Sequence, residues 1–321
     1  MHMWYNITIM DLTSVKIIKE LLSKYKAQPS KRLGQNFLID KNVLDKIIKT
    51  ADLKPNDTVL EVGPGIGTLT QELAKSAGKV IAVEKDKKMC EILNSEILNK
   101  TLNNSCAKNG TIVPFLAQLN NIEIIHGDIL KLNPKRYTLN PNYKVVANIP
   151  YYLTSPIIRK FLESDNPPTE IILMVQKEVG QRICAKPPSP PHQSFKKTSG
   201  VGARMSLLAV SVQFYAEAKI ISYVSKNCFW PSPKVDSAII KIIPGGLTSR
   251  KAGGQTSPDL FFRIVKAGFS QPRKQLGNNL SKVLKIDRKK IDDWLAKNNI
   301  KPTQRAETLS IDDWISLSQN F

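Results

Sequence analysis

A short motif near the middle of the chain, Asn148-Ile149-Pro150-Tyr151-Tyr152, combines an amide, a proline and two aromatic rings. The side-chain oxygen of Asn148 and the main-chain carbonyl of Ile149 could together accept both hydrogens of an amine. Pro150 restricts Ile149 to an extended conformation, which aims that carbonyl outward, and Tyr151 could stack on a flat ring. By itself an N-x-P-Y tetrapeptide is more often a proline turn. The motif therefore indicates chemistry on a base amine only if the rest of the chain supplies a reagent.

A glycine-rich turn could hold that reagent. The predicted strand that contains Val59–Val62 leads into Gly63-Pro64-Gly65-Ile66-Gly67, and a helical pattern begins at Thr68. Glycines at such a turn let the backbone come close to a ligand. The dinucleotide fingerprint G-x-G-x-x-G needs a glycine where Thr68 stands, so the turn disfavours NAD. A cofactor with a nucleoside and an amino-acid part, such as S-adenosylmethionine, fits better.

Two acidic residues end the strands that are predicted next. Glu84 follows 79–83 and could accept hydrogen bonds from both ribose hydroxyls, and Asp128 follows 122–125 and could accept one from an adenine amine. Either residue taken singly could instead be a turn or helix cap. Their shared position at the carboxyl edge of a sheet favours a role at the cofactor.

Methyl transfer to an adenine amine is the reaction that suits these parts. The lone pair of that amine is delocalised into the ring, and two acceptors at Asn148 and Ile149 would localise it for attack on a sulfonium methyl group. The base must first leave the helical stack, and Tyr151 and Phe229 could then enclose it. The loop that begins at Phe229 could also be a plain hydrophobic plug. No general base needs to be assigned.

The elements that must position these residues alternate along the chain. Helices are predicted near 40–51, 68–76 and 155–163, and strands at 58–62, 79–83, 122–125, 144–147 and 170–175. This alternation predicts an α/β fold with a mainly parallel, doubly wound sheet. Two further strands, Ile220–Val224 and Val235–Ile243, could pair antiparallel at the sheet edge.

The chain divides into three predicted parts. Residues 1–30 form an N-terminal helical extension, 31–246 the S-adenosylmethionine-dependent domain, and 247–321 a small all-helical RNA-binding domain. The last boundary rests on the break at Pro244-Gly245-Gly246. Beyond it, helices are predicted near 258–269, 272–284, 287–298 and 310–319.

The net charge and the cysteine content limit which partners, metals and disulfides the protein is expected to have. Lys and Arg number 47 against 27 Asp and Glu, a net charge of +20, which favours a nucleic acid, although an anionic membrane surface or a generally basic proteome would also fit. Cys90, Cys106, Cys184 and Cys228 have no metal-ligand spacing, so no metal site and no disulfide framework are expected. No apolar stretch is long enough to span a bilayer. We expect a soluble cytoplasmic protein with no membrane association.

Taken together the motifs resemble those of the KsgA-type ribosomal RNA small-subunit adenine dimethyltransferases. The resemblance covers nearly the whole chain from Lys31 onward, and its six motifs occur in order. They are Gly34–Leu38, Glu61–Gly67, Asn148–Tyr151, Gln176–Val179, Phe229–Ala238 and Arg273–Leu280.

The resemblance implies a Rossmann-like class I methyltransferase sheet with a small C-terminal all-helical domain. It also implies an activity and assigns site residues. The activity is dimethylation of the N6 amines of two adjacent adenosines near the 3′ end of small-subunit (16S) rRNA, with S-adenosyl-L-methionine, during ribosome assembly. The residues implied around the cofactor are Asn36, Leu38, Gly63, Gly65, Glu84, Asp128 and Asn148. Those implied at the target base are Asn148, Tyr151 and Phe229, and the motif itself adds Ile149 and Pro150 as predicted catalytic residues.

Two other functions stay open, and three segments depart from the family pattern. The chain could be a large-subunit rRNA adenine methyltransferase of the macrolide-resistance type, although Arg273–Leu280 favours the small-subunit type. It could also be a non-catalytic RNA-binding factor on the same fold. Segments 1–30, 101–120 and 186–204 look additional, and the last is interpreted as an RNA-facing loop or a linker without a role. We expect a monomer.

Overall fold

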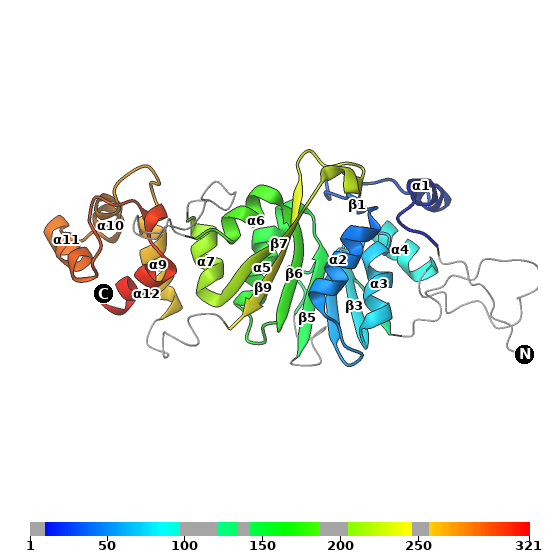
Figure 1. The fold of residues 1–321 in the computed structure, drawn as a ribbon, viewed down its shortest axis with the longest axis horizontal. Coiled ribbons are helices and arrows are strands. Elements are labelled where there is room, and N and C mark those ends of the chain that lie inside the picture. The colour runs from blue at the N-terminus through cyan, green and yellow to red at the C-terminus, as the bar shows by residue number, and fades with distance from the viewer. Residues whose placement is uncertain (1–9, 97–120, 134–141, 187–204, 246–256) are drawn as a thin grey trace, which may run out of the picture. The chain divides into compact units, whose positions relative to one another are not determined.

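The computed structural model describes residues 10–96, 121–133, 142–186, 205–245 and 257–321 (Figure 1). Packing divides the chain into two compact units: Met1–Lys177 with Ile221–Lys241, and Glu178–Ile220 with Ile242–Phe321. The segment 101–120 and nearly all of 186–204 lie outside the described residues. The division at residues 30 and 246 into functional domains stays a prediction.

A seven-stranded sheet, most of which belongs to the first unit, has the strand order β4-β3-β2-β5-β6-β9-β7. The strands are β2 (Thr58–Val62), β3 (Lys79–Glu84), β4 (Ile122–His126), β5 (Tyr143–Asn148), β6 (Glu170–Gln176), β7 (Ala216–Val224) and β9 (Ser237–Pro244). Strands β2 to β6 pair in parallel. The Rossmann-like sheet is thus confirmed, as is the neighbouring position of β7 and β9 at its edge.

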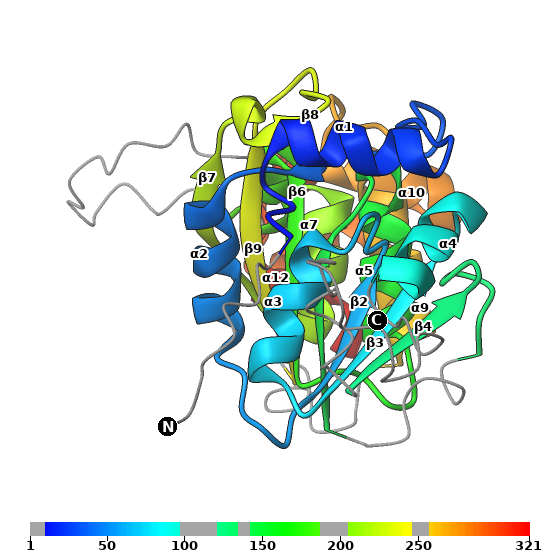
Figure 2. The same cartoon turned by 90° about the vertical axis from the view of Figure 1, so that its right-hand side faces the viewer.

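Helices cover the sheet on both faces (Figures 1 and 2). They are α2 (Lys41–Ala51), α3 (Thr68–Ser76), α4 (Lys87–Glu96) and α5 (Thr154–Leu162). Apolar residues of α2, α3 and α4 share one core with strand residues such as Val59 and Val146. Connections between parallel strands are right-handed, so α5, which steps across the sheet in the opposite direction, lies on the other face. Side chains on both faces of the sheet are therefore buried, and Leu60 and Ile81 are among them.

Local sequence explains where the helices nearest the site begin. Asp40 precedes α2, and its carboxylate accepts a hydrogen bond from the Val43 main-chain nitrogen at 3.1 Å. Gly67 precedes α3 with φ of 90°, a conformation that glycine adopts without strain. Both helix starts thereby bring the preceding loops to the carboxyl edge of the sheet.

An N-terminal helix and a two-stranded ribbon complete the first unit. The helix α1 (Val15–Lys24) buries Ile18 and Leu21 in one cluster with Phe37 and Ile66. The ribbon pairs β1 (Phe37–Leu38) antiparallel with β8 (Phe229–Trp230). Helix α4, the ribbon and the short 3₁₀ helices η3 (Tyr151–Leu153) and η4 (Lys226–Cys228) were not anticipated from the sequence pattern.

The second unit is mainly helical. Its helices are α6 (Lys177–Ile183), α7 (Leu207–Tyr215), α9 (Pro258–Gly268), α10 (Leu276–Leu284), α11 (Arg288–Lys297) and α12 (Ile311–Gln319), with the 3₁₀ helix η5 (Ala306–Thr308). They enclose a core that contains Phe214, Phe261 and Trp314. The four C-terminal helices are confirmed, although α10 begins later than expected because Gln271 to Gln275 form turns and a cap. No helix in the described ranges has the length and apolarity needed to cross a membrane.

Candidate active site

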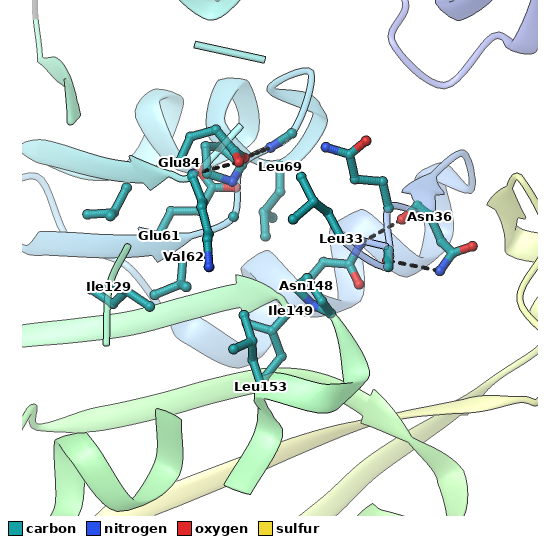
Figure 3. Close-up of a pocket in the computed structure, with 18 of the residues that line it drawn as sticks. Leu33, Asn36, Glu61, Val62, Leu69, Glu84, Ile129, Asn148, Ile149 and Leu153 are labelled. Carbon is teal, nitrogen blue, oxygen red and sulfur yellow. Dashed lines mark hydrogen bonds between the residues drawn. The ribbon is translucent and has the colours of Figure 1, made fainter. Parts of the chain in front are cut away.

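A pocket at the carboxyl edge of the sheet brings together every residue that the sequence assigned to the cofactor or the target base. Figure 3 labels four of them: Asn36, Glu84, Asn148 and Ile149. The residues concerned are Asn36, Leu38, Gly63, Gly65, Glu84, Asp128, Asn148, Ile149, Pro150, Tyr151 and Phe229. They come from the ends of β2, β3, β4 and β5 and from the β1–β8 ribbon. Parallel strands end at the same sheet edge, which is why residues far apart in sequence meet here.

The glycine turn forms one wall of this pocket. Gly63 and Gly65 have φ of 68° and 60°, a conformation that side chains with a Cβ rarely adopt. A Cβ on Gly65 would lie 3.1 Å from Cε1 of Phe37. Because it carries no side chain there, the turn can pack closely against Phe37 of β1.

Glu84 lies at the end of β3 with 6% of its surface exposed. Its Oε2 accepts a hydrogen bond from the Gly65 main-chain nitrogen at 3.0 Å, and its Oε1 accepts bonds from the main-chain nitrogens of Lys85 and Asp86, both at 2.7 Å. Burial raises the pKa of Glu84, and these amide donors act against that rise. The carboxylate is therefore fixed in orientation beside the glycine turn.

Asp128 already has a cationic partner at the pocket. Lys85 Nζ lies 2.8 Å from Asp128 Oδ2, and Asp128 Oδ1 accepts a bond from the Leu130 main-chain nitrogen at 3.0 Å. The hydrogen bond from Lys85 lowers the pKa of Asp128 and raises that of Lys85 in return. Asp128 is consequently ionised at neutral pH. Its predicted bond to an adenine amine stays a prediction.

Asn148 ends β5 and contacts the N-terminal segment directly. Its side-chain nitrogen donates to the Asn36 main-chain carbonyl at 3.2 Å (Figure 3). Because the nitrogen is engaged there, the side-chain oxygen is the atom left to accept a further hydrogen bond. Ile149 follows with 2% of its surface exposed, and Pro150 holds it in extended backbone.

Tyr151 and Phe229 are anchored by different means. The Tyr151 hydroxyl lies 2.8 Å from the Ser237 hydroxyl, and burial raises the pKa of Tyr151. Phe229 is 3% exposed and pairs with Leu38 across the β1–β8 ribbon. The ribbon therefore joins the loop at Phe229 to the segment around Asn36.

The structure adds residues that sequence reasoning did not assign a role. Glu61, in the middle of β2, is 1% exposed, and its Oε2 has no hydrogen-bond partner. Burial, together with the nearby charge of Glu84, raises the pKa of Glu61 to about 8. Gln35 donates to Asp86 Oδ2 at 2.9 Å and so ties the N-terminal segment to the end of β3. An acidic residue inside an apolar strand was the one signal that could have identified Glu61.

These features fit a polar ligand that has hydroxyl or amine donors. Gly63 and Gly65, the fixed Glu84 carboxylate and Glu61 with its unpartnered oxygen all line the pocket. A donor group of a bound ligand would satisfy that oxygen, which otherwise carries a desolvation penalty. Among the described residues, no cluster of His, Cys, Asp or Glu has the arrangement of a metal site.

Comparisons with known proteins agree with this geometry. The profile described as "Ribosomal RNA adenine dimethylase" matches residues 26–321. "Ribosomal RNA small subunit methyltransferase A" of Dehalococcoides mccartyi strain BAV1 is 40% identical over 294 residues, which are 91% of this chain and 88% of that protein. The protein of the same name from Clostridioides difficile strain 630 is 38% identical over 311 residues, 96% of each chain.

Solved structures support the same assignment. A dimethyladenosine transferase from Plasmodium falciparum has a TM-score of 0.63 and 26% identity, with 88% of this chain and 95% of that chain covered. The 23S rRNA methyltransferase ErmE also has a TM-score of 0.63, and its 24% identity indicates a shared fold. The profile and the curated relatives extend over most of the sequence, and so the chain belongs to the ribosomal RNA adenine dimethylase family.

Proposed function

We propose that this protein transfers methyl groups from S-adenosyl-L-methionine to the N6 amines of two adjacent adenosines near the 3′ end of small-subunit rRNA, during ribosome assembly. The observation that carries the proposal is the hydrogen bond from the Asn148 amide to the Asn36 carbonyl, 3.2 Å long. It leaves the Asn148 oxygen as an acceptor in the pocket that the glycine turn also lines.

The cofactor would lie along the glycine turn. Gly63 and Gly65 would allow its close approach, Glu84 would accept from ribose hydroxyls, and Asp128 would accept from the adenine amine. Asn36 and Leu38 would cover it from the β1 side. When bound, S-adenosyl-L-methionine supplies the electrophilic methyl group. The unpartnered oxygen of Glu61 would receive a donor from the same ligand.

The target base would enter from the β5 side. Asn148 Oδ1 and the Ile149 carbonyl would accept the two amine hydrogens and so localise the nitrogen lone pair. Pro150 would hold that carbonyl in place. Tyr151 and Phe229 would stack on the extruded ring, and stacking of this kind contributes about 1–3 kcal/mol per base.

Relatives favour small-subunit rRNA over the large-subunit alternative. The curated relatives at 38–40% identity are named for the small subunit, whereas the structure named for 23S rRNA resembles this chain in fold. The net charge of +20 suits an RNA partner in either case. We further propose a cytoplasmic monomer with no metal, whose C-terminal helices contribute RNA contacts.

The proposal is tested by methylation of purified subunits. Small and large ribosomal subunits that lack adenine dimethylation are incubated with the protein and isotopically labelled S-adenosyl-L-methionine, and the RNA is digested and analysed by mass spectrometry. Labelled N6,N6-dimethyladenosine should come from the small subunit alone. Label in the large subunit would support the macrolide-resistance type, and binding without any label would support a non-catalytic factor.

A further inference from the structure

An aromatic ring stands exposed at the end of the edge strand β7. Tyr223 is 52% exposed, although the neighbouring Val224 is only 4% exposed and belongs to the core. We propose that Tyr223, together with Lys177, forms a platform on which the RNA stacks a base that flanks the target adenosine. The proposal rests on the proposed function, and it concerns a subsite outside the cofactor and target-base pocket.

Lys177 is held against the Tyr223 ring. Its Nζ lies 5.2 Å from the ring centroid, a cation–π distance. Its main-chain nitrogen donates to the Asp236 carbonyl at 3.0 Å, and its Nζ is 4.0 Å from Asp236 Oδ2. The ring is thus accompanied by a positive charge whose backbone is fixed to the start of β9.

A short chain of contacts connects this platform to the proposed base pocket. Asp236 Oδ1 also accepts from the Lys226 main-chain nitrogen at 3.1 Å, which fixes the loop that leads to Phe229. Ser237, the next residue, has its hydroxyl 2.8 Å from that of Tyr151. The platform and the pocket are therefore attached to one β9 terminus within the same compact unit.

The chemistry of the platform fits a nucleotide of a single strand. Extrusion of one base from a stack leaves its neighbours without a partner, and an exposed aromatic ring can replace that partner for any base because every base has a π face. Lys177 could contact a phosphate oxygen of the same strand. Lys226, three residues further along the chain, is exposed as well and adds a second positive charge to this segment.

Kinetics of three substitutions separate stacking from other contacts. Tyr223→Ala and Tyr223→Leu should each raise the KM for unmethylated small ribosomal subunits about 10-fold, because both remove the π face. Tyr223→Phe keeps the ring and should stay within about 2-fold of the unsubstituted protein. Unchanged unfolding temperatures verify that all three fold. The platform proposal is refuted if Tyr223→Ala leaves the KM unchanged. It is also refuted if Tyr223→Leu has the KM of the unsubstituted protein.

A cross-link identifies what lies on the ring. Tyr223 is replaced by p-benzoylphenylalanine, the protein is bound to the same subunits and irradiated, and the site is mapped by primer extension and mass spectrometry. We expect a cross-link to a nucleotide directly beside the dimethylated pair. A cross-link to a ribosomal protein, to a distant part of the RNA, or to nothing overturns the platform. Absence of dimethylation by the unsubstituted protein would instead refute the proposed function, whatever the cross-link shows.

Discussion

Asn148 depends on a residue more than a hundred positions earlier for its orientation. Its side-chain nitrogen is engaged by the Asn36 carbonyl, and Asn36 in turn donates from its own side chain to the Gly34 carbonyl at 3.1 Å. The two motifs therefore act as one structural element, in which the N-terminal segment determines which end of the Asn148 amide can receive an amine.

Replacement of Asn148 should separate catalysis from RNA binding. Asn148→Ala removes an acceptor for the amine hydrogens, and removal of one such transition-state interaction typically lowers kcat about 100- to 1000-fold. Binding of small subunits should change little because the amide does not bind a phosphate. The measurements are single-turnover methyl transfer and filter binding. Asn94→Ala, which removes an amide bonded to the Cys90 carbonyl on α4, is the matched control, and full activity of Asn148→Ala would refute the mechanism.

Glu61 is the residue whose ionisation should influence stability most visibly. Its pKa of about 8 in the folded protein lies above the ordinary value of 4.5, because burial disfavours the charged form. The folded state therefore keeps a proton that the unfolded state loses as the pH rises above 4.5. Stability is largest below that value and falls until the pH reaches about 8, after which both states are ionised.

Glu61→Gln should remove this part of the pH dependence. Without ligand, the free energy of unfolding of the unsubstituted protein should fall between about pH 5 and about pH 8 by on the order of a few kcal/mol more than that of the glutamine variant. Urea denaturation at the two pH values measures both. Glu123→Gln, at an exposed carboxylate on β4, should leave the pH dependence unchanged. Parallel profiles for Glu61→Gln and the unsubstituted protein would contradict a buried, protonated Glu61.

At the scale of elements, α1 supports the cofactor side of the pocket without lining it. Ile18 and Leu21 pack with Phe37 of β1 and Ile66 of the glycine turn. Tyr25, just after the helix, donates its hydroxyl to Glu96 Oε1 at 2.6 Å and so joins α1 to the end of α4. The helix thus stabilises the two segments that would enclose a cofactor.

Shortening a buried side chain of α1 should therefore affect both the stability of the protein and its affinity for the cofactor. Ile18 has no exposed surface, and Ile18→Ala should lower the free energy of unfolding by about 2–5 kcal/mol. It should also weaken binding of S-adenosyl-L-methionine, measured by isothermal titration calorimetry at a temperature where the variant is folded. Glu20→Ala, on the exposed side of the same helix, serves as the control. Unchanged affinity in a destabilised Ile18→Ala would show that α1 acts on the fold alone.

At the scale of the whole molecule, the excess of positive charge should govern affinity for RNA. The described residues of the second unit include exposed cations in the turn before α10 and along α11, among them Arg273, Lys274 and Lys289. Each phosphate that such a cation neutralises releases counterions, so binding should weaken steeply with salt.

Neutralising two of these cations should flatten the salt dependence. Arg273→Ala with Lys274→Ala should lower affinity for small subunits and reduce the slope of log K against log salt by about 1 for each phosphate that the variant no longer neutralises. Lys54→Ala, in the turn before β2, where Lys54 is paired with Asp52, should leave the slope unchanged. A slope identical to that of the unsubstituted protein would exclude these positions from the RNA interface.

Local sequence alone determined most of the fold and brought several predicted residues to one pocket. The bounds of β2 and α3 agree with the predicted ones because apolar periodicity and the glycine turn act over a few residues. Gly63, Glu84 and Asn148 line the same pocket because parallel strands end at the same edge of the sheet. The alternating pattern also predicted the sheet, since right-handed crossovers leave few topologies.

Tertiary structure decided what depends on contacts between distant segments. The β1–β8 ribbon, the partner of the Asn148 amide, the Lys85–Asp128 pair and the position of Lys177 over Tyr223 each join residues that no local pattern relates. The raised pKa of Glu61 likewise reflects burial by neighbouring elements. Periodicity reports which face of an element is buried, but it does not report which side chain lies opposite, because that is fixed only when the elements pack.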